Sequence, residues 1–85
     1  MNQALADKLK TLPASPGVYF HKDQSGEVIY VGKAAVLKNR VRQYFSGSPK
    51  DLKTTKLVQH IAMTDWIETD SEIDALFLEN EMIKR

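Results

Sequence analysis

Hydrophobic and polar residues alternate in two short segments of the N-terminal half of the chain. Residues 17–20 read Gly-Val-Tyr-Phe, and residues 28–33 read Val-Ile-Tyr-Val-Gly-Lys. Both segments are rich in β-branched and aromatic residues, which favour strands. The turn-forming residues Asp-Gln-Ser-Gly occupy positions 23–26 between them. The pattern therefore predicts a β-hairpin.

The register of this hairpin determines where its two tyrosines lie. A loop over residues 23–26 pairs Lys22 with Glu27 and, in the same register, Tyr19 with Tyr30. Both phenols then share one face, since side chains alternate along a strand, and a slip of one residue would separate them. The opposite face carries Val18, Phe20, Ile29 and Val31. Such a pair is either an aromatic contact that only stabilises the sheet or part of a site.

Helical periodicity predicts the elements around the hairpin. We expect helices over residues 2–10, over residues 34–45 and from about Thr54, and a third strand over residues 65–69. The helix over 34–45 opens without a capping residue, so its first amides are predicted to be free for a phosphate or for water. Thr69 and Glu72 have the spacing of a capping box for a last helix. These elements predict an α+β fold.

The last helix places one carboxylate on its apolar side. At 100° per residue, Glu79 falls within the apolar arc, whereas Asp74, Glu81 and Arg85 lie on the opposite side. A carboxylate turned toward a core is costly unless a cation or hydrogen bonds receive it. Glu79 is therefore either a structural partner, for example of Arg40, or a metal-binding or catalytic residue. The arc comprises Ala75, Leu76, Leu78, Met82 and Ile83, widened by Ile73 and Phe77.

Length and composition limit the possible classes. A chain of 85 residues is one small domain at most, and without cysteine it has neither disulfides nor thiolate metal sites. No apolar run approaches the ~18 residues of a membrane span, and the N-terminus has no secretory signal pattern. We therefore expect a cytoplasmic protein that does not enter a membrane.

The net charge of +1 conceals a strong asymmetry. Residues 33–60 contain seven basic residues against one acidic residue, a net charge of +6. Residues 61–85 contain two basic residues against seven acidic residues, a net charge of −5. A basic central segment indicates an anionic partner such as nucleic acid, and the alternative is a set of solvated helix faces.

The polar side chains of these segments suit phosphodiester hydrolysis. A carboxylate such as Glu79 holds a hard cation like Mg²⁺, which also binds the substrate phosphate. Arg40 has the planar guanidinium that neutralises transition-state oxygens, and it shares a helix face with Tyr44 four residues later, whereas Arg42 projects away. A tyrosine acts as a base only as phenolate, which the charge of Lys33 would favour for Tyr30.

Other chemistries find no support in the sequence. The chain has no Walker-type loop, no dinucleotide-binding glycine pattern and no cluster of His and Cys residues. The two histidines, His21 and His60, are far apart in sequence, and we expect each to be a surface or capping residue.

These residues together resemble the GIY-YIG nuclease superfamily, and within it the N-terminal catalytic domain of the UvrC family. The resemblance covers about residues 12–85 and depends on the order and spacing of several short motifs. They are Gly17-Val18-Tyr19, Tyr30-Val31-Gly32-Lys33, Arg40, Tyr44 and Glu79. It implies a three-stranded antiparallel sheet flanked by helices, in a single domain over residues 1–85 excised from the N-terminal part of a longer protein.

The resemblance also implies a role for each residue. Glu79 would hold one divalent metal ion, Mg²⁺ or Mn²⁺, and Tyr30 would be the general base, with Lys33 helping to deprotonate it. Tyr19 would position the water and the phosphate. Arg40 would stabilise the transition state, and Tyr44 would support the scissile phosphate. Nucleic-acid contacts are expected from Gly32, Lys33, Lys38, Arg40 and Arg42.

In the UvrC family this domain cuts damaged duplex DNA on the 3′ side of a lesion in nucleotide excision repair. The resemblance therefore implies DNA as substrate, UvrA and UvrB as partners of the full-length protein, and a monomer. Alternatives are a stand-alone Cho-like or homing-type nuclease, a non-catalytic nucleic-acid-binding module, and a structural interaction domain whose tyrosines only pack.

Overall fold

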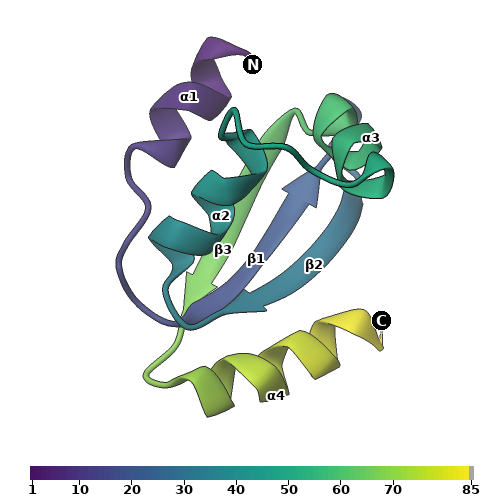
Figure 1. Cartoon of the computed structure of the whole chain (residues 1–85). Helices are drawn as coiled ribbons and strands as arrows, with labels where there is room; N and C mark the ends of the chain where they lie inside the picture. Colours follow the sequence, from purple (N-terminus) through teal and green to yellow (C-terminus); the bar gives the residue numbers. More distant parts are fainter. Residues whose placement is uncertain (85) are drawn as a thin grey trace.

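Three antiparallel strands form the centre of the molecule. The computed structural model describes residues 1–84 and contains β1 (Gly17–Lys22), β2 (Val28–Ala34) and β3 (Met63–Glu68). β1 lies in the middle, so the order is β2-β1-β3 (Figure 1). The predicted three-stranded antiparallel sheet is confirmed.

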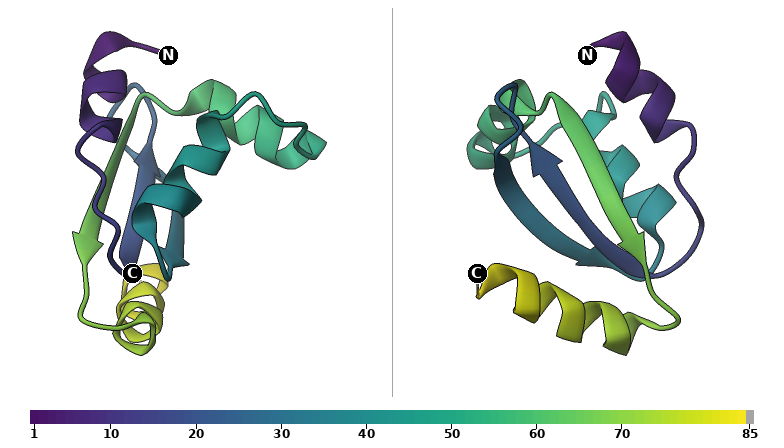
Figure 2. Two further views of the ribbon diagram at one scale, coloured as in Figure 1. Left: turned by 60° about the vertical axis from the view of Figure 1, so that its left-hand side comes forward. Right: turned by 180° about the vertical axis from the view of Figure 1, so that it is seen from behind.

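Four helices surround this sheet within the described residues. They are α1 (Gln3–Leu9), α2 (Leu37–Phe45), α3 (Leu52–His60) and α4 (Glu72–Ile83). α1 and α2 lie over one face of the sheet, whereas α4 runs past the end of the sheet where β1 begins and β2 ends (Figures 1 and 2). α4 contacts both of these strands. No helix of the described residues is long and apolar enough to span a membrane.

The main hydrophobic core fills the space between the sheet and the layer of α1 and α2. Tyr19 belongs to it and is almost completely buried, so this tyrosine stabilises the fold whatever else it does. The two helices reach the core through residues spaced three or four apart, as an amphipathic helix requires. The buried members of the cluster are Leu5, Leu9, Leu12, Tyr19, Ala34, Leu37, Val41 and Ile61.

The hairpin has a different register from the predicted one. Tyr19 lies opposite Gly32, and Tyr30 lies opposite His21, so the predicted Tyr19–Tyr30 pair is wrong by two positions. A bulge between His21 and Lys22 absorbs the irregular step beside the loop. Because the displacement is two residues and side chains alternate with period two, the two tyrosines still share one face.

The loop itself explains this register. The Asp23 carboxylate accepts hydrogen bonds from the amides of Ser25 and Glu27 at 2.9 and 3.0 Å. Gly26 has a φ of 87°, which glycine adopts without a steric penalty. The Asp23 amide also donates to the Glu27 carbonyl at 2.9 Å. The turn is thus closed between residues 23 and 27, one residue longer than predicted.

α2 begins later than predicted, because β2 continues through Ala34. The amides of Leu37 and Lys38 donate to the carbonyls of Ser15 and Pro13 at 2.9 and 3.0 Å. The prediction that the first amides of this helix are free for a phosphate is therefore wrong for these two amides. The same hydrogen bonds tie α2 to the segment that leads into β1, and so fix the helix above the sheet.

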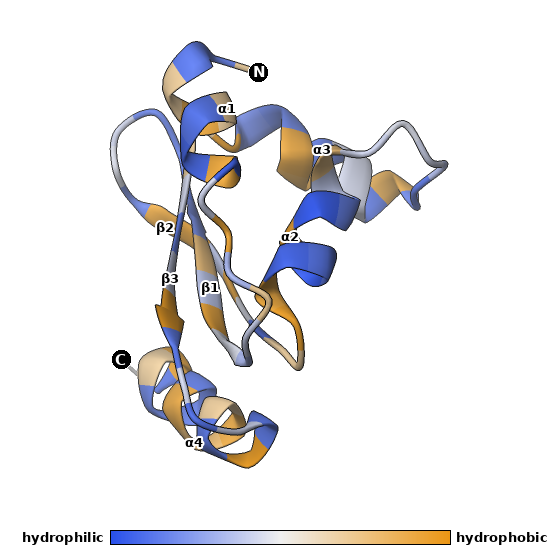
Figure 3. Cartoon of the chain, turned by 90° about the vertical axis from the view of Figure 1, so that its left-hand side faces the viewer, coloured by the Kyte–Doolittle hydropathy of each residue, from blue (hydrophilic) through white to orange (hydrophobic). Residues whose placement is uncertain are grey.

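α4 turns a narrower face to the sheet than its sequence predicts. Ala75 is buried, and Leu78, Glu79 and Met82 are half-buried, with the i, i+3, i+4, i+7 spacing of one helix face. The predicted inward orientation is wrong for Ile73, Leu76, Phe77 and Ile83, which are exposed. In Figure 3 hydrophobic segments therefore occur all around α4. Arg85 lies outside the described residues.

The N-terminal cap of α4 also differs from the prediction. The Ser71 hydroxyl accepts from the Asp74 amide at 3.1 Å, whereas the Thr69 hydroxyl donates to the Ser71 carbonyl at 2.8 Å. Ser71 is thus the capping residue, and the predicted box of Thr69 and Glu72 is wrong. α3 is capped by Asp51, whose carboxylate accepts from the Thr54 amide at 2.6 Å.

Candidate functional site

Two rows of side chains cross the sheet beneath α2. In one row Tyr19 on β1 lies between Trp66 on β3 and Gly32 on β2. In the next row His21 lies between Thr64 and Tyr30. Residues two apart on a strand share a face, so both tyrosines project toward α2. Their ring centroids are 6.2 Å apart.

Gly32 makes room for the Tyr19 ring. A Cβ atom at position 32 would lie 2.5 Å from the Tyr19 Cζ and hydroxyl oxygen, closer than atoms in real proteins approach. Gly32 is also buried. The glycine of the Tyr-Val-Gly-Lys segment is therefore required by packing, and its predicted contact with nucleic acid stays a prediction.

α2 adds a third tyrosine to this cluster. The hydroxyl groups of Tyr44 and Tyr19 form a hydrogen bond of 2.8 Å. The Tyr44 ring centroid lies 5.7 Å from that of Tyr19 and 6.1 Å from that of Tyr30. The three tyrosines that the sequence singled out thus lie together, although they come from β1, β2 and α2.

Burial makes two of these phenols harder to deprotonate than an ordinary tyrosine. It raises the pKa of Tyr44 well above its ordinary value, and the hydrogen bond with Tyr19 adds to this shift. Burial also raises the pKa of Tyr19, whereas the hydrogen bond with Tyr44 and the charge of Arg40 lower it part of the way back. Tyr19 and Tyr44 are therefore neutral hydroxyl groups, and the one that accepts in their mutual hydrogen bond has its proton free to donate to an anion.

Tyr30 differs from the other two, because it is on the edge strand β2 and 40% exposed. It is the tyrosine of the cluster that solvent and a substrate reach most readily. Lys33, its predicted helper, lies opposite Val18 in the register. The alternation of side chains turns Lys33 to the face away from the three rings.

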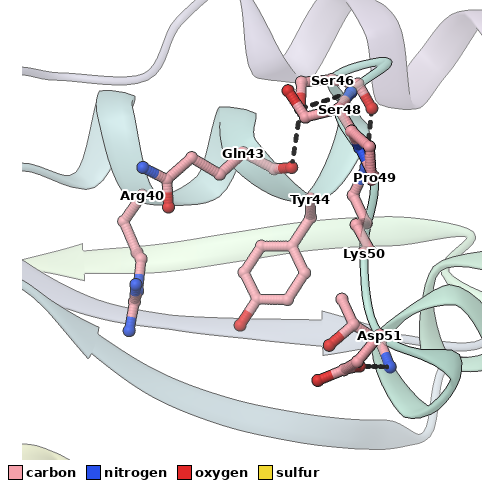
Figure 4. Close-up of a pocket in the computed structure, with 9 residues that line it drawn as sticks. Arg40, Gln43, Tyr44, Ser46, Ser48, Pro49, Lys50 and Asp51 are labelled. Atoms are coloured by element: carbon pink, nitrogen blue, oxygen red, sulfur yellow. Dashed lines mark hydrogen bonds between the residues drawn. The ribbon is translucent and has the colours of Figure 1, made fainter.

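Arg40 projects from α2 in the same direction as Tyr44, toward the strands (Figure 4). The positive charge of its guanidinium lowers the pKa of Tyr19 in part, against the larger effect of burial. Arg40 and Tyr44 also form one wall of a cavity of about 530 Å³. The remaining wall comes from α2, the loop after it and the start of α3: Gln43, Ser46, Ser48, Pro49, Lys50, Asp51 and Thr54.

Glu79 is half-buried on the side of α4 that packs against the sheet, as its position in the apolar arc predicted. The structural alternative was an ion pair with Arg40. Among residues 1–84 no ion pair involves Glu79; the acidic partners in the ion pairs found there are Asp7 and Asp65. A half-buried carboxylate without a protein cation is a suitable ligand for an added one.

His21 contradicts the prediction of a surface or capping residue. Its side chain is completely buried, and its Nδ1 lies 2.8 Å from the Thr64 hydroxyl oxygen. Burial lowers the pKa of His21 to about 4, so the imidazole is neutral at physiological pH. The error came from the apparent isolation of His21 in the sequence, although its period-two relation to Tyr19 already placed it on the same face. His60 is exposed, as predicted.

The other predicted contacts to nucleic acid lie on α2. Arg42 is exposed and Lys38 is half-buried, so both cations remain available at the surface of the helix. They lie within the basic segment of residues 33–60. Their contacts with DNA stay predictions.

Comparison with known proteins places this geometry in a family. The sequence profile described as the UvrC-like GIY-YIG domain matches residues 15–85. A UvrABC system protein C from Thermoanaerobacter sp. (strain X514) is 52% identical over 82 residues, and one from Streptococcus gordonii is 54% identical over 84 residues. The alignments cover 95% and 99% of this chain. The chain therefore belongs to the UvrC-like GIY-YIG endonuclease domains.

The aligned regions are only 13% and 14% of these two relatives, so the chain spans about one seventh of their length. A solved structure agrees with the fold over the whole chain. It is the GIY-YIG N-terminal endonuclease domain of UvrC from Thermotoga maritima, bound to magnesium as its catalytic divalent cation. It is 33% identical, has a TM-score of 0.84, and the match covers 99% of this chain and 91% of that one. A variant of that domain with one tyrosine replaced by phenylalanine also binds the cation, and matches with a TM-score of 0.85 at 32% identity over 99% and 90% of the two chains.

The donor set of this chain fits a cation of that kind. Within residues 1–84 no group of three or more His, Cys, Asp or Glu side chains forms a protein cage for a metal. Mg²⁺ does not require one, because it keeps several waters and is commonly held by one or two carboxylates and substrate phosphates. The half-buried carboxylate of Glu79 has the oxygen chemistry that such a site requires.

Proposed function

We propose that this chain is the catalytic domain of a divalent-metal-dependent DNA endonuclease that cuts the damaged strand on the 3′ side of a lesion in nucleotide excision repair. The observation that carries the proposal is the convergence of Tyr19, Tyr30 and Tyr44 beside Arg40. An unpaired, half-buried Glu79 on α4, judged within the described residues, adds a ligand for the metal.

Glu79 would hold the metal ion, with waters and a phosphate oxygen of the DNA completing the coordination. When bound, Mg²⁺ or Mn²⁺ polarises the phosphate and stabilises the leaving oxygen. The chain contributes the position of that ion through α4, whose contact with β1 and β2 ties it to the strands that carry Tyr19 and Tyr30.

Tyr30 is the residue that receives the proton of the attacking water. The hydroxyl proton of Tyr30, the exposed phenol of the cluster, first passes to solvent. A water oxygen then forms a new bond to phosphorus as its proton passes to the Tyr30 oxygen, the bond between phosphorus and the leaving oxygen breaks, and the leaving oxygen takes a proton from solvent. Tyr19 and Tyr44 are unsuited to this step, because burial holds their protons. Since the strand alternation turns Lys33 away from the rings, we assign Lys33 to the DNA backbone rather than to contact with Tyr30.

The remaining groups orient the phosphate and stabilise its charge. Tyr19 and Tyr44 share one hydroxyl–hydroxyl hydrogen bond, and the phenol that accepts in it keeps its own proton to donate to a phosphate oxygen or to the ordered water. Arg40 provides a planar, permanently charged donor for the transition-state oxygens. The cavity bordered by Arg40 and Tyr44 would receive the flanking DNA backbone, with Lys38 and Arg42 adding charge on α2.

The intact protein would act on damaged duplex DNA together with UvrA and UvrB. This rests on the relatives, which are named as components of the UvrABC system. A nuclease of Cho-like or homing type would use the same site without these partners. A non-catalytic module would use the basic segment for binding alone.

Nicking of supercoiled plasmid with excess protein tests the proposal. We expect nicking by the chain with Mg²⁺ or Mn²⁺ but not with EDTA, and a fall of at least about 10²-fold for Tyr30→Phe. Val28→Ala, at an exposed position of the same strand, is the matched control and should nick normally. DNA binding without any metal-dependent nicking would favour the non-catalytic module, and equal nicking by Tyr30→Phe would refute the assignment of the base.

A further inference from the structure

His21 is buried at the centre of the site, yet neither the family pattern nor the proposed chemistry uses it. Its side chain has no exposure to solvent. It is surrounded by aromatic rings: the centroid of Tyr44 lies at 4.6 Å, that of Tyr19 at 5.4 Å, that of Phe45 at 6.0 Å and that of Tyr30 at 6.1 Å. The imidazole therefore contacts all three tyrosines of the site.

The contacts differ in geometry, and each limits the movement of a different ring. Tyr44 meets the imidazole at an angle of 73°, whereas Tyr30 lies roughly parallel to it at 26°. Tyr44 is near the end of α2, and Tyr30 is on an edge strand with a half-exposed ring. His21 thus lies behind Tyr44 and Tyr30, the two tyrosines of the cluster that are not completely buried.

A hydrogen bond fixes the plane of the imidazole. Nδ1 lies 2.8 Å from the Thr64 hydroxyl oxygen, and Thr64 is itself completely buried on β3. Nε2 is buried and has no hydrogen-bond partner within the described part of the chain. A buried polar atom without a partner lowers stability, so an apolar ring would serve a purely structural role better.

We propose that His21 is a positioning residue, which, anchored by Thr64, holds the rings of Tyr44 and Tyr30 in the orientation that phosphodiester hydrolysis requires. The inference rests on the proposed function and adds a residue to it. His21 does not touch the DNA or the metal, because it is buried. It acts through the two tyrosines.

Three variants separate this role from a structural one. His21→Phe keeps a ring and removes the hydrogen bond, but leaves the Thr64 hydroxyl unpaired. The double variant His21→Phe/Thr64→Val removes both polar partners, so it should recover much of the stability that the single variant loses. Phe20→Leu, one residue earlier on the opposite face of β1, is the control for mild destabilisation of the same strand.

We expect kcat for nicking to fall by about fivefold or more in both His21 variants, with KM for DNA changed less than about twofold, because a misplaced group costs rate rather than affinity. The double variant should keep the low kcat although its Tm recovers. Recovery of kcat together with Tm would overturn the proposal, as would an equal loss of kcat in Phe20→Leu.

A second measurement does not depend on activity. Aromatic ¹H–¹³C NMR spectra of the metal-free chain should show shifted or broadened ring signals of Tyr30 and Tyr44 in the double variant, and unchanged signals in Phe20→Leu. Unchanged tyrosine signals in the double variant would overturn the positioning role even if the wild-type chain were found not to nick DNA. If the wild-type chain did not nick DNA but the double variant still showed shifted tyrosine signals, the positioning role would stand and only the proposed function would be refuted.

Discussion

The tyrosine cluster and helix α4 contribute to the candidate site in opposite ways. The cluster is held by a hydroxyl–hydroxyl hydrogen bond, by close ring contacts and by strand pairing on both sides of β1. α4 contacts β1 and β2, but it buries only Ala75 completely and leaves Phe77 and Ile73 about two-thirds exposed. The cluster is fixed by its own packing, whereas α4 leaves the Glu79 carboxylate half-buried on the side that packs against the sheet.

This difference follows from the chemistry that each region is proposed to perform. Neutral phenols that orient a phosphate need a fixed position and little solvent, and burial supplies both. A metal ligand must instead remain ionised and accessible to a hydrated cation. The Glu79 carboxylate is accessible to such a cation because it is only half-buried and has no ion-pair partner among residues 1–84.

Replacing the carboxylate on α4 should have the largest effect on activity. Glu79→Gln keeps the size of the side chain and removes the anionic oxygen ligand, so we expect Mg²⁺-dependent nicking to fall by about 10³-fold. DNA binding should be retained, and Tm should change little, because Glu79 has no ion-pair partner among residues 1–84. Plasmid nicking and fluorescence anisotropy measure the two quantities.

Glu81→Gln is the matched control for this experiment. Glu81 is exposed on the same helix two residues later. The Glu81→Gln variant should nick DNA like the wild type. A comparable loss of activity in Glu79→Gln and Glu81→Gln would mean that the overall charge of α4 matters rather than a ligand at position 79.

The tyrosine cluster should make the stability of the fold depend on pH through His21. The pKa of His21 is lowered to about 4 in the folded state from about 6.5 in the unfolded chain, so between these values the unfolded state binds more protons. The stability that His21 provides is fully present above about pH 6.5 and is lost as pH falls toward 4, by about 3 kcal/mol.

Urea unfolding at several pH values between 4 and 7 measures this loss. The variant His21→Phe/Thr64→Val should unfold with a free energy that depends much less on pH over the same range. An identical pH dependence in this variant and the wild type would show that other groups cause the loss.

Arg40 lines the cavity next to the tyrosine cluster, and its replacement separates a role in catalysis from a role in DNA binding. Arg40→Ala should lower kcat by about 10- to 30-fold and weaken DNA binding by less than about threefold, since the guanidinium acts chiefly on the transition state. Arg42→Ala, two residues later and exposed, should leave kcat unchanged and reduce the salt dependence of binding by about one phosphate contact. An effect of Arg40→Ala on binding alone would favour the non-catalytic module.

The smallest expected effect concerns the stability of the cluster. Tyr19→Phe removes one partner of the hydroxyl–hydroxyl bond and leaves the Tyr44 hydroxyl without it, so the free energy of unfolding should fall by about 1 kcal/mol. The double variant Tyr19→Phe/Tyr44→Phe should be less destabilised than the sum of the single variants. If denaturant unfolding showed that the losses of unfolding free energy in the two single variants simply add up in the double variant, this hydrogen bond would not contribute to stability.

Much of the fold and of the cluster could be predicted from the sequence. Alternation with period two placed Tyr19 and Tyr30 on one face, and helical spacing placed Glu79 on the sheet side of α4. Both predictions hold despite small errors of register or boundary. In a strand, for example, a displacement of two residues leaves a side chain on the same face of the sheet. The exact pairing could not be predicted, because the bulge beside Lys22 and the Asp23 hydrogen bonds are tertiary details of one turn.

The remaining errors share one cause: the features that were mispredicted depend on contacts between segments that are distant in the sequence. The start of α2 depends on the carbonyls of Pro13 and Ser15, which accept its first amides. The burial of His21 depends on Thr64, 43 residues away. The apolar residues of α4 surround most of the helix, so its sequence alone did not show that Phe77 would be exposed and Leu78 half-buried.

The most direct test of the account is a crystal structure of this chain soaked with Mn²⁺, with the ion located by its anomalous signal. We predict one ion about 2 Å from a Glu79 carboxylate oxygen, on the side of α4 that faces the strands of Tyr19 and Tyr30. We also predict no ion at this position in Glu79→Gln crystals. An ion bound elsewhere, or an unchanged ion in the variant, would contradict the claim that α4 supplies the metal ligand of this site.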